Sequence, residues 1–325
     1  MSLARAFFIV GPTAAGKSEL AADVAREMGA EVVGADAFQI YSGLNLLTAK
    51  PNATTLATAP HHLIGTMPLD QEMNAEKFRR AASRAIDEIQ SRGKEAIIVG
   101  GSGLYVKALT HGLAPLPKAD PKLRAKLHAL GTDALRSQLA HLDPETARKI
   151  DSKNRRRLVR ALEICLLTGK PVSVQHTQRA VAGGVEPGPP RSPPAATKGS
   201  TITATFRGVF VFRDRDELYE RINRRAEAMF EEGVIEEVRA AGAVSSTASQ
   251  MIGLREIREL LAGKMSIAQC VAAIQQATRR YAKRQLTWFR RQTNFEPLNL
   301  SLLSHNEAVN WILLRAQRSF AHRDD

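Results

Sequence analysis

The residues with the clearest capacity for chemistry lie near the start of the chain. Residues 11–18 read G-P-T-A-A-G-K-S, which fits the pattern G-x-x-x-x-G-K-S of a phosphate-binding loop. Its glycines let the backbone curl so that N–H groups, a helix N-terminus and Lys17 together attract an anion. The predicted phosphate ligands are Gly11, Pro12, Thr13, Ala14, Ala15, Gly16, Lys17 and Ser18. The Ser18 hydroxyl is also a candidate ligand of a divalent metal.

Two further polar side chains lie at the ends of predicted strands. Asp36 ends a predicted strand over 31–36, and Ser102 follows the apolar run 96–99 and two glycines. Because the carboxyl ends of parallel strands face the ligand crevice, both side chains are expected near the phosphates. Asp36 could bind a metal, act as a general base or cap the following segment. Ser102 could donate to a phosphate oxygen or cap a helix.

The elements that would position these residues alternate between strand and helix. Phe7, Phe8, Ile9 and Val10 form an apolar run typical of a strand buried on both faces, and an apolar-periodic helix follows the loop. The pattern predicts an α/β fold with a P-loop NTPase-like parallel sheet flanked by helices. A chance glycine-rich turn is the alternative to a phosphate-binding loop, but the flanking strand and helix argue against it.

The middle of the chain departs from this alternation. Residues 122–176 read as helices only, and residues 183–199 are rich in Gly and Pro. We therefore predict a core domain over 1–117 and 204–325, with an all-helical insertion domain over 118–203. The insertion ends in a flexible Gly/Pro connector over about 177–203. Arg215 is expected at a strand-to-helix junction over the phosphate site, with Arg221 about one and a half turns later.

Charge indicates a polyanionic partner. The chain of 325 residues has a net charge of +13. Residues 1–150 hold 18 Lys and Arg against 15 Asp and Glu, whereas residues 151–325 hold 28 against 18. The excess lies away from the phosphate loop, which favours nucleic acid first, an acidic membrane surface second, and solubility alone as the plainest reading.

Local clusters favour nucleic acid. Residues 153–160 hold four Arg and one Lys with no acid, and residues 279–291 hold six basic residues interleaved with three aromatics. Basic helices with aromatic rings suit RNA phosphates and bases, although Trp288 and Phe289 could equally anchor their helix to the core. No apolar run approaches the ~20 residues of a membrane span. Two widely separated cysteines, Cys165 and Cys270, favour a reducing cytoplasm.

Three classes of function remain open from these residues. The first is a P-loop kinase of a small molecule or a nucleic acid, in which Asp36 would activate a hydroxyl. The second is a transferase whose loop holds a diphosphate leaving group. The third is an RNA-binding protein whose nucleotide only switches conformation.

Seven segments together resemble one family. They are GPTAAGKS at 11–18, D-x-x-Q-I-Y at 36–41, TAKP at 48–51, PHHL at 60–63, GGSGLY at 100–105, RRLVRALEI at 156–164 and KRQLTWFR at 283–290. In this order they resemble the tRNA dimethylallyltransferases, also called tRNA isopentenyltransferases. The resemblance implies transfer of a dimethylallyl group from dimethylallyl diphosphate to N6 of the adenosine immediately 3′ of the anticodon. Diphosphate leaves, and Mg²⁺ is the implied cofactor.

The resemblance also assigns roles to residues. It implies that Asp36 is the general base, that Ser102 lies by the leaving oxygen, and that Arg215 and Arg221 grip the diphosphate. It implies an anticodon stem-loop clasped by the insertion, and a monomer is our default expectation. The implied RNA-binding residues are Asp36, Ala37, Phe38, Gln39, Ser102, Arg124, Arg156, Arg157, Leu158, Val159, Arg160, Gln250, Met251, Ile252, Gly253, Leu254, Arg255, Lys283, Arg284, Gln285, Leu286, Thr287, Trp288, Phe289 and Arg290.

Two departures from the family pattern lie in the site. Ala37 replaces a usual serine, which removes one hydrogen bond near the target base. Ser102 replaces a usual threonine, so the hydroxyl is kept but its rotamer is freer.

Overall fold

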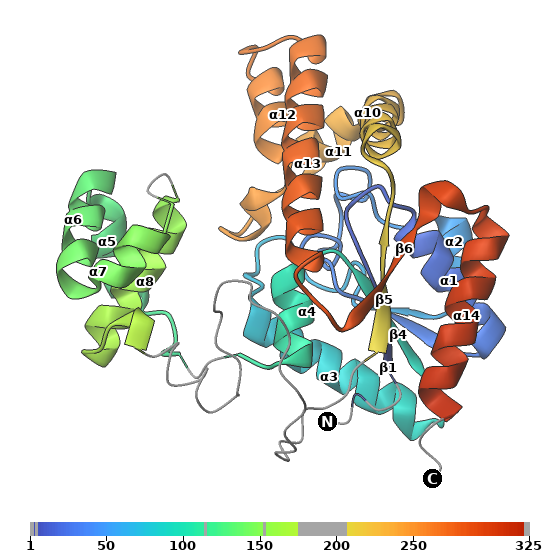
Figure 1. Ribbon diagram of the computed structural model, residues 1–325. Helices are drawn as coiled ribbons and strands as arrows, with labels where there is room; N and C mark the ends of the chain where they lie inside the picture. Colours follow the sequence, from blue (N-terminus) through green and yellow to red (C-terminus); the bar gives the residue numbers. More distant parts are fainter. Residues whose placement is uncertain (1–2, 4–5, 114–115, 152–153, 175–206, 322–325) are drawn as a thin grey trace, which may run out of the picture. The chain divides into compact units, whose positions relative to one another are not determined.

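The computed structural model describes residues 3, 6–113, 116–151, 154–174 and 207–321 (Figure 1). The chain divides into two compact units, Met1–Gly112 with Ala204–Asp325, and Leu113–Thr203. The first boundary falls slightly before the predicted 117/118. The predicted Gly/Pro connector over 177–203 lies outside the described residues.

A six-stranded sheet with parallel pairing forms the centre of the first unit, in the order β3-β2-β4-β1-β5-β6. This confirms the predicted α/β fold. The strands are β1 (Ala6–Val10), β2 (Glu31–Gly34), β3 (His61–His62), β4 (Ala96–Gly100), β5 (Arg207–Phe212) and β6 (Phe295–Asn299). The central position of β1 places the loop that follows it between the ends of β4 and β5.

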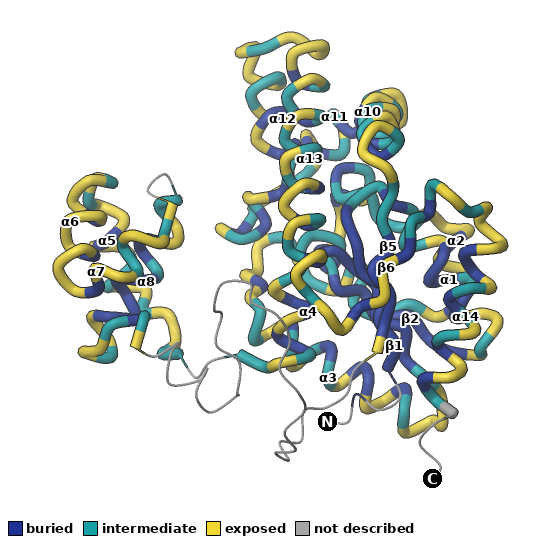
Figure 2. Tube along the Cα trace, viewed as in Figure 1, coloured by how far each residue is buried: buried dark blue, intermediate teal, exposed yellow. Residues whose placement is uncertain are grey.

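Both faces of the sheet are buried, as the unbroken apolar runs predict. Phe8 and Val10 of β1 point into one hydrophobic cluster, and Phe7 and Ile9 point into another on the opposite face. Helices α1 (Lys17–Met28) and α14 (His305–Ala321) contribute to the second cluster, whereas α3 (Ala75–Ser91) and α4 (Gly103–Thr110) contribute to the first (Figure 1). Strands β1, β2 and β4 are buried along their whole length and are accordingly dark blue in the burial view of Figure 2.

The described part of the first unit contains five further helices and two short 3-10 turns. They are α2 (Ala53–Thr58), α10 (Arg215–Glu231), α11 (Val234–Ala240), α12 (Leu254–Leu261) and α13 (Ile267–Phe289), with short 3-10 turns η1 (Ala248–Gln250) and η2 (Leu300–Leu302). Among the described residues, no helix is both long enough and apolar enough to cross a membrane.

Strand β6 was not predicted from the sequence. Its residues read F-E-P-L-N, and Pro297 pairs in register with Phe210 of β5. A proline cannot donate to a sheet ladder and is found on edge strands, which is where β6 lies. With five residues and a proline among them, β6 is too short for the alternation of apolar and polar side chains to reveal a strand.

The second unit is helical where it is described. It contains α5 (Pro121–Ala129), α6 (Thr132–Leu142), α7 (Pro144–Lys149) and α8 (Arg155–Thr168). Its core packs Leu127, Leu135, Leu139, Leu158 and Leu162. The side chain of Asn154 accepts a hydrogen bond from the Arg157 N–H and so begins α8.

Candidate active site

The phosphate-binding loop joins the end of β1 to the start of α1. Gly11 is required there because a Cβ would lie 2.1 Å from the Val211 carbonyl oxygen of β5. Gly16 has φ +94°, a backbone conformation that favours glycine. The loop therefore runs tightly against the neighbouring strand before it turns into α1, and the first N–H groups of that helix have no intrahelical partner.

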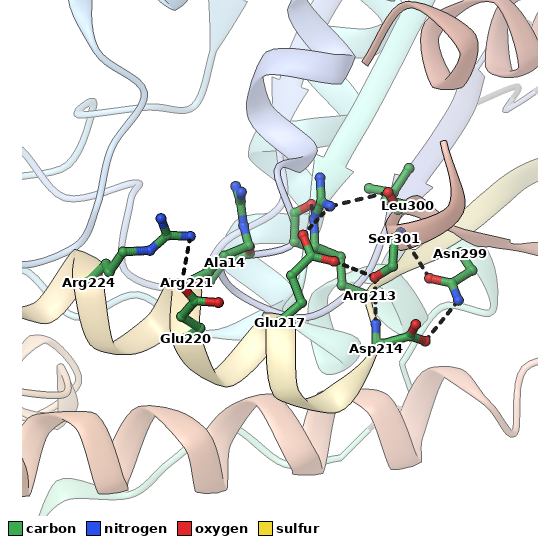
Figure 3. Close-up of polar contacts among 11 residues, drawn as sticks. Ala14, Arg213, Asp214, Glu217, Glu220, Arg221, Arg224, Asn299, Leu300 and Ser301 are labelled. Carbon is green, nitrogen blue, oxygen red and sulfur yellow. Dashed lines mark hydrogen bonds and ion pairs between the residues drawn. The ribbon is translucent and has the colours of Figure 1, made fainter. Parts of the chain in front are cut away.

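Three cations donate to consecutive parts of the loop. Lys17 Nζ lies 2.6 Å from the Pro12 oxygen, and Arg221 Nε lies 2.8 Å from the Ala14 oxygen. Arg213 Nε lies 3.1 Å from the Ala15 oxygen. The arginines approach from the end of β5 and from α10 (Figure 3). Both terminal nitrogens of Arg221 and the NH2 nitrogen of Arg213 donate to no described residue, so they are available for a ligand.

The terminal nitrogens of these arginines face the loop's centre. A Cβ built on Gly16 would lie 3.7 Å from one nitrogen of Arg221 and 3.8 Å from one of Arg213. Arg225 adds a fourth cation, with one terminal nitrogen 3.0 Å from Thr13 Oγ1. This arrangement can bind a multiply charged anion through several charge-assisted hydrogen bonds at once.

Burial makes the positive charges of this cluster energetically unfavourable. It lowers the pKa of Lys17 to about 8, against a raising effect of the Asp36 charge and a further lowering by Arg225. Burial also lowers the pKa of Arg221 and Arg225, and neighbouring arginines lower both further. Cations held together with partial loss of water favour an anion that restores their charge balance.

A second set of contacts orients Arg213. Its NH1 donates to Glu217 Oε1 at 2.5 Å and to the Leu300 oxygen at 3.2 Å. Glu217 in turn accepts from the Ser301 hydroxyl at 2.5 Å (Figure 3). Burial opposes the lowering of the Glu217 pKa, but the bonds and charges of Ser301 and Arg213 outweigh it. Arg213 is thus fixed at the loop by η2 and α10.

Arg213 occupies the place that the sequence predicted for Arg215. Helix α10 begins at Arg215 with Asp214 as its N-cap, so Arg213 is the residue that leaves β5 over the loop. The Arg215 guanidinium instead lies 5.3 Å from the centre of the Tyr219 ring. The sequence did not identify Arg213 or Arg225, because the residue at which α10 begins cannot be read from the local pattern and Arg225 lies further along the same helix.

Asp36 and Ser102 lie at neighbouring strand ends, as predicted. The Ala35 N–H donates to the Val99 oxygen at 2.7 Å, which joins the end of β2 to β4. Ser102 Oγ accepts from the Ala37 N–H at 2.9 Å. Ser102 is the N-cap of α4 but makes no side-chain capping bond. Its hydroxyl therefore serves the segment that carries Asp36.

The Asp36 carboxylate has two different oxygens. Oδ1 accepts from the N–H groups of Phe38 and Gln39 at 2.9 and 3.3 Å. Oδ2 accepts no hydrogen bond from the residues that the structure describes. Asp36 therefore does cap the following turn, as one alternative held, and still presents an oxygen for chemistry. Its charge raises the pKa values of Lys17, Arg225 and Tyr281, so it is electrostatically coupled to the cation cluster.

Gln39 is held by the segment that follows it. Its Nε2 donates to the Ala49 oxygen at 2.7 Å and weakly to the Thr48 oxygen at 3.4 Å. Within the described part of the chain its Oε1 has no donor. This fixes the amide orientation and leaves a carbonyl oxygen that can accept from an amino group.

Tyr281 was counted in the sequence only as an aromatic of a basic helix. Burial raises the pKa of its hydroxyl, the Asp36 charge raises it further, and the Ser102 and Gln285 side chains oppose the rise. The phenol therefore stays protonated and is electrostatically coupled to both predicted catalytic side chains. Tyr281 is far from Asp36 and Ser102 in the sequence, so no local pattern predicted this relationship.

The predicted RNA-binding residues divide by burial. Arg156, Arg157, Gln250, Arg255, Lys283, Arg284, Thr287 and Arg290 are exposed, and Ala37, Phe38, Gln39, Arg124, Arg160, Ile252, Leu286 and Trp288 are half-buried. Seven further predicted residues, none of them at a strand end, are buried. They are Leu158, Val159, Met251, Gly253, Leu254, Gln285 and Phe289. RNA contact by these seven residues stays a prediction. The family resemblance implied it for whole segments, whereas only one face of a helix is exposed.

Arg124 and Arg160 have an internal partner. Two nitrogens of Arg124 donate to Glu163 at 2.9 and 3.0 Å, and Arg160 NH1 donates to the same carboxylate at 2.5 Å. Glu163 is 0% exposed. Burial opposes the lowering of its pKa, but the two arginines and the Asp120 N–H outweigh it. These arginines thus help to hold the helical unit together.

The donor set for a metal is small. Among the described residues no group of three or more His, Cys, Asp or Glu could hold an ion. Ser18 at the start of α1 makes no side-chain hydrogen bond to a described residue, so its hydroxyl is free to coordinate. Mg²⁺ commonly takes one or two protein oxygens together with substrate phosphates and waters. The residues therefore fit a magnesium ion that arrives with a phosphate ligand.

Comparison with known proteins identifies the family of this chain. The IPP transferase family model matches residues 39–292. The chain is 43% identical over 291 residues to the tRNA dimethylallyltransferase of Geobacter sulfurreducens, covering 87% of this chain and 88% of the relative. It is 41% identical over 288 residues to tRNA dimethylallyltransferase 1 of Citrifermentans bemidjiense, with coverage of 87% and 88%.

Solved structures give the same picture. The full-length tRNA isopentenylpyrophosphate transferase of Bacillus halodurans is 31% identical, with a TM-score of 0.66 and 99% of both chains covered. A eukaryotic dimethylallyltransferase acting on tRNA has a TM-score of 0.71 at 24% identity, covering 98% of this chain and 78% of that one, and shares the fold. With its phosphate loop, strand-end carboxylate and matched length, the chain belongs to the IPP transferase family, and its curated relatives are tRNA dimethylallyltransferases.

Proposed function

We propose that this enzyme transfers the dimethylallyl group of dimethylallyl diphosphate to N6 of the adenosine immediately 3′ of the anticodon in tRNA, releasing diphosphate. The observation that carries the proposal is the cluster of Lys17, Arg213, Arg221 and Arg225 around the phosphate loop, with the Asp36 carboxylate beside it. One half of the site suits a leaving anion and the other a nucleophile that must lose a proton.

The diphosphate half works by charge balance. As the bond between the allylic carbon and oxygen breaks, negative charge grows on the departing diphosphate. The four cations and the first N–H groups of α1 are already in place to stabilise it, so little reorganisation is needed during the reaction. Lys17 adds most to this effect when it carries its proton, which a bound anion favours.

The nucleophile half rests on Asp36. An adenine amine is a weak nucleophile because its lone pair is delocalised into the ring. As N6 forms its bond to the allylic carbon, Asp36 takes the N6 proton on Oδ2, since Oδ1 already accepts from Phe38 and Gln39. In this proposal Gln39 Oε1 accepts the other amino hydrogen of the target adenine.

Magnesium would be held by the Ser18 hydroxyl together with oxygens of the substrate. When bound it supplies further charge stabilisation at the diphosphate. This proposal extends the family assignment to a named metal, and it rests on the unpartnered hydroxyl at the start of α1.

RNA recognition is assigned to two exposed basic surfaces. One is Arg156 and Arg157 at the start of α8. The other is the outer face of α13 with Lys283, Arg284 and Arg290. We assign them to the anticodon stem-loop, with the target base flipped out of its stack to reach Asp36.

A monomer in the cytoplasm is the simplest setting, and both cysteines are free and buried.

The deciding experiment separates transfer from phosphorylation. The protein and tRNA are incubated with labelled dimethylallyl diphosphate or with γ-labelled ATP, and tRNA nucleosides are then analysed by mass. We expect an adenosine carrying the added dimethylallyl group from the first donor and no label from ATP. Label from ATP in any product would favour a P-loop kinase instead, and the absence of both would favour a binding protein.

A further inference from the structure

One buried amide joins the phosphate loop to the end of β4. Gln285 is 5% exposed and projects from α13. Its Oε1 accepts from the Thr13 N–H at 2.9 Å, and its Nε2 donates to the Gly101 oxygen at 2.9 Å. Both ends of this amide already bond to residues more than half the chain away in the sequence. Because the side chain is also buried, it cannot bind RNA from this position.

Glycines allow α13 to come this close. A Cβ on Gly101 would lie 2.3 Å from Gln285 Nε2, and a Cβ on Gly103 would lie 2.6 Å from the Trp288 ring. Ala282 and Leu286 of α13 pack in one small cluster with Ala14 of the phosphate loop. The helix therefore presses on the loop through both apolar contacts and the Gln285 amide.

Thr13 is the loop residue that receives this contact. Pro12 has no N–H, and the Gly11 N–H donates to the Gly100 oxygen at 3.3 Å. The Thr13 N–H is thus the first loop amide that the sheet leaves open, and Gln285 takes it. Arg225 holds the Thr13 hydroxyl from the other side. Fixing Thr13 at two points sets the direction in which the later amides of the loop face.

We infer that Gln285 is a positioning residue for the diphosphate. It holds the first limb of the phosphate loop so that the cations and helix amides meet the anion in one fixed geometry. This inference rests on the proposed function, because it concerns the same diphosphate site. It also reassigns Gln285 from RNA contact to diphosphate binding.

The test compares variants that keep the size of the side chain. Gln285→Met fills the same space but loses both hydrogen bonds, and Gln285→Glu keeps an acceptor for Thr13 but cannot donate to Gly101. Gln276→Met on the exposed side of α13 is the matched control. Each protein is titrated with magnesium diphosphate by calorimetry, then with tRNA, and KM for dimethylallyl diphosphate and kcat are measured.

We expect both Gln285 variants to bind diphosphate about tenfold or more weakly and to raise the KM for the donor by a similar factor. We expect tRNA affinity within about twofold of the wild type, and Gln276→Met unchanged throughout. Equal diphosphate affinity in the variants, or a parallel loss of tRNA affinity, would overturn the inference. So would unfolding of both variants by circular dichroism, because the residue would then act in folding alone. Failure of the wild type itself to bind diphosphate or to transfer the allyl group would instead refute the proposed function.

Discussion

Arg221 donates its Nε hydrogen to the Ala14 carbonyl oxygen at 2.8 Å and keeps its terminal nitrogens for a ligand. A guanidinium can do this because its five N–H groups lie in one rigid plane, whereas an ammonium group has no such division of roles. The contact converts a mobile side chain into part of the loop wall. Arg213 makes the same kind of contact with Ala15, so the loop is lined by two oriented guanidinium groups.

Arg221→Lys should therefore weaken donor binding although the charge is kept. Loss of the oriented contact should raise the KM for dimethylallyl diphosphate by about ten- to a hundredfold, since a hydrogen bond to a charged group is worth about 1.5–3 kcal/mol. Steady-state kinetics with saturating tRNA measures it. Arg213→Lys should behave alike, and Arg215→Ala should have a smaller effect because its guanidinium lies on Tyr219. A larger effect at Arg215 than at Arg213 would contradict this placement.

Part of the site could be predicted from the sequence, but the choice between Arg213 and Arg215 could not. Strand-end rules correctly brought Asp36, Ser102 and the phosphate loop together, because strand order and loop position follow from short local patterns. They could not choose between two arginines separated by one residue, since the choice depends on where α10 begins. They also could not find Gln285 or Tyr281, which reach the site only because Gly101 and Gly103 admit a distant helix.

Asp36→Asn should separate chemistry from binding. The amide keeps the shape of the side chain and can still accept from Phe38 and Gln39 through its oxygen, but it cannot take a proton at neutral pH. We expect kcat to fall by about 10²–10⁴-fold, the usual contribution of a general base, with tRNA affinity unchanged. Single-turnover kinetics and a filter-binding assay measure the two quantities. Near-normal turnover would rule out Asp36 as the base.

Tyr281→Phe tests the phenol beside Asp36. Burial raises the pKa of this hydroxyl, so it stays protonated and acts as a hydrogen-bond donor or acceptor, not as a charge. We expect a smaller loss than for Asp36, about five- to twentyfold in kcat, in keeping with one neutral hydrogen bond. The pH profile of kcat should keep its shape. A profile that loses a limb in the variant would mean that Tyr281 itself transfers the proton.

Lys17 should link diphosphate binding to proton uptake. Its pKa of about 8 in the folded protein lies below its ordinary 10.5, so between these values the unfolded chain binds more protons than the folded one. In this window the group makes the free energy of unfolding rise with pH. A bound anion raises the pKa again, so binding at about pH 9 should take up as much as one proton. Calorimetry in two buffers of different ionisation enthalpy measures the uptake, and Lys17→Met should lower it; equal uptake in that variant would exclude Lys17 as the source.

The exposed arginines at the start of α8 should carry part of the RNA affinity. Arg156 and Arg157 are exposed, whereas Leu158 and Val159 beside them are in the core, so the cations project from a fixed support. Changing both to Glu should weaken tRNA binding and make it less dependent on salt, because each lost phosphate contact lowers the slope of log K against log salt by about one. Arg136→Glu, on the exposed face of α6 in the same helical unit, controls for the change in net charge. Equal weakening per charge in both proteins would show that overall charge, and not this surface, binds the RNA.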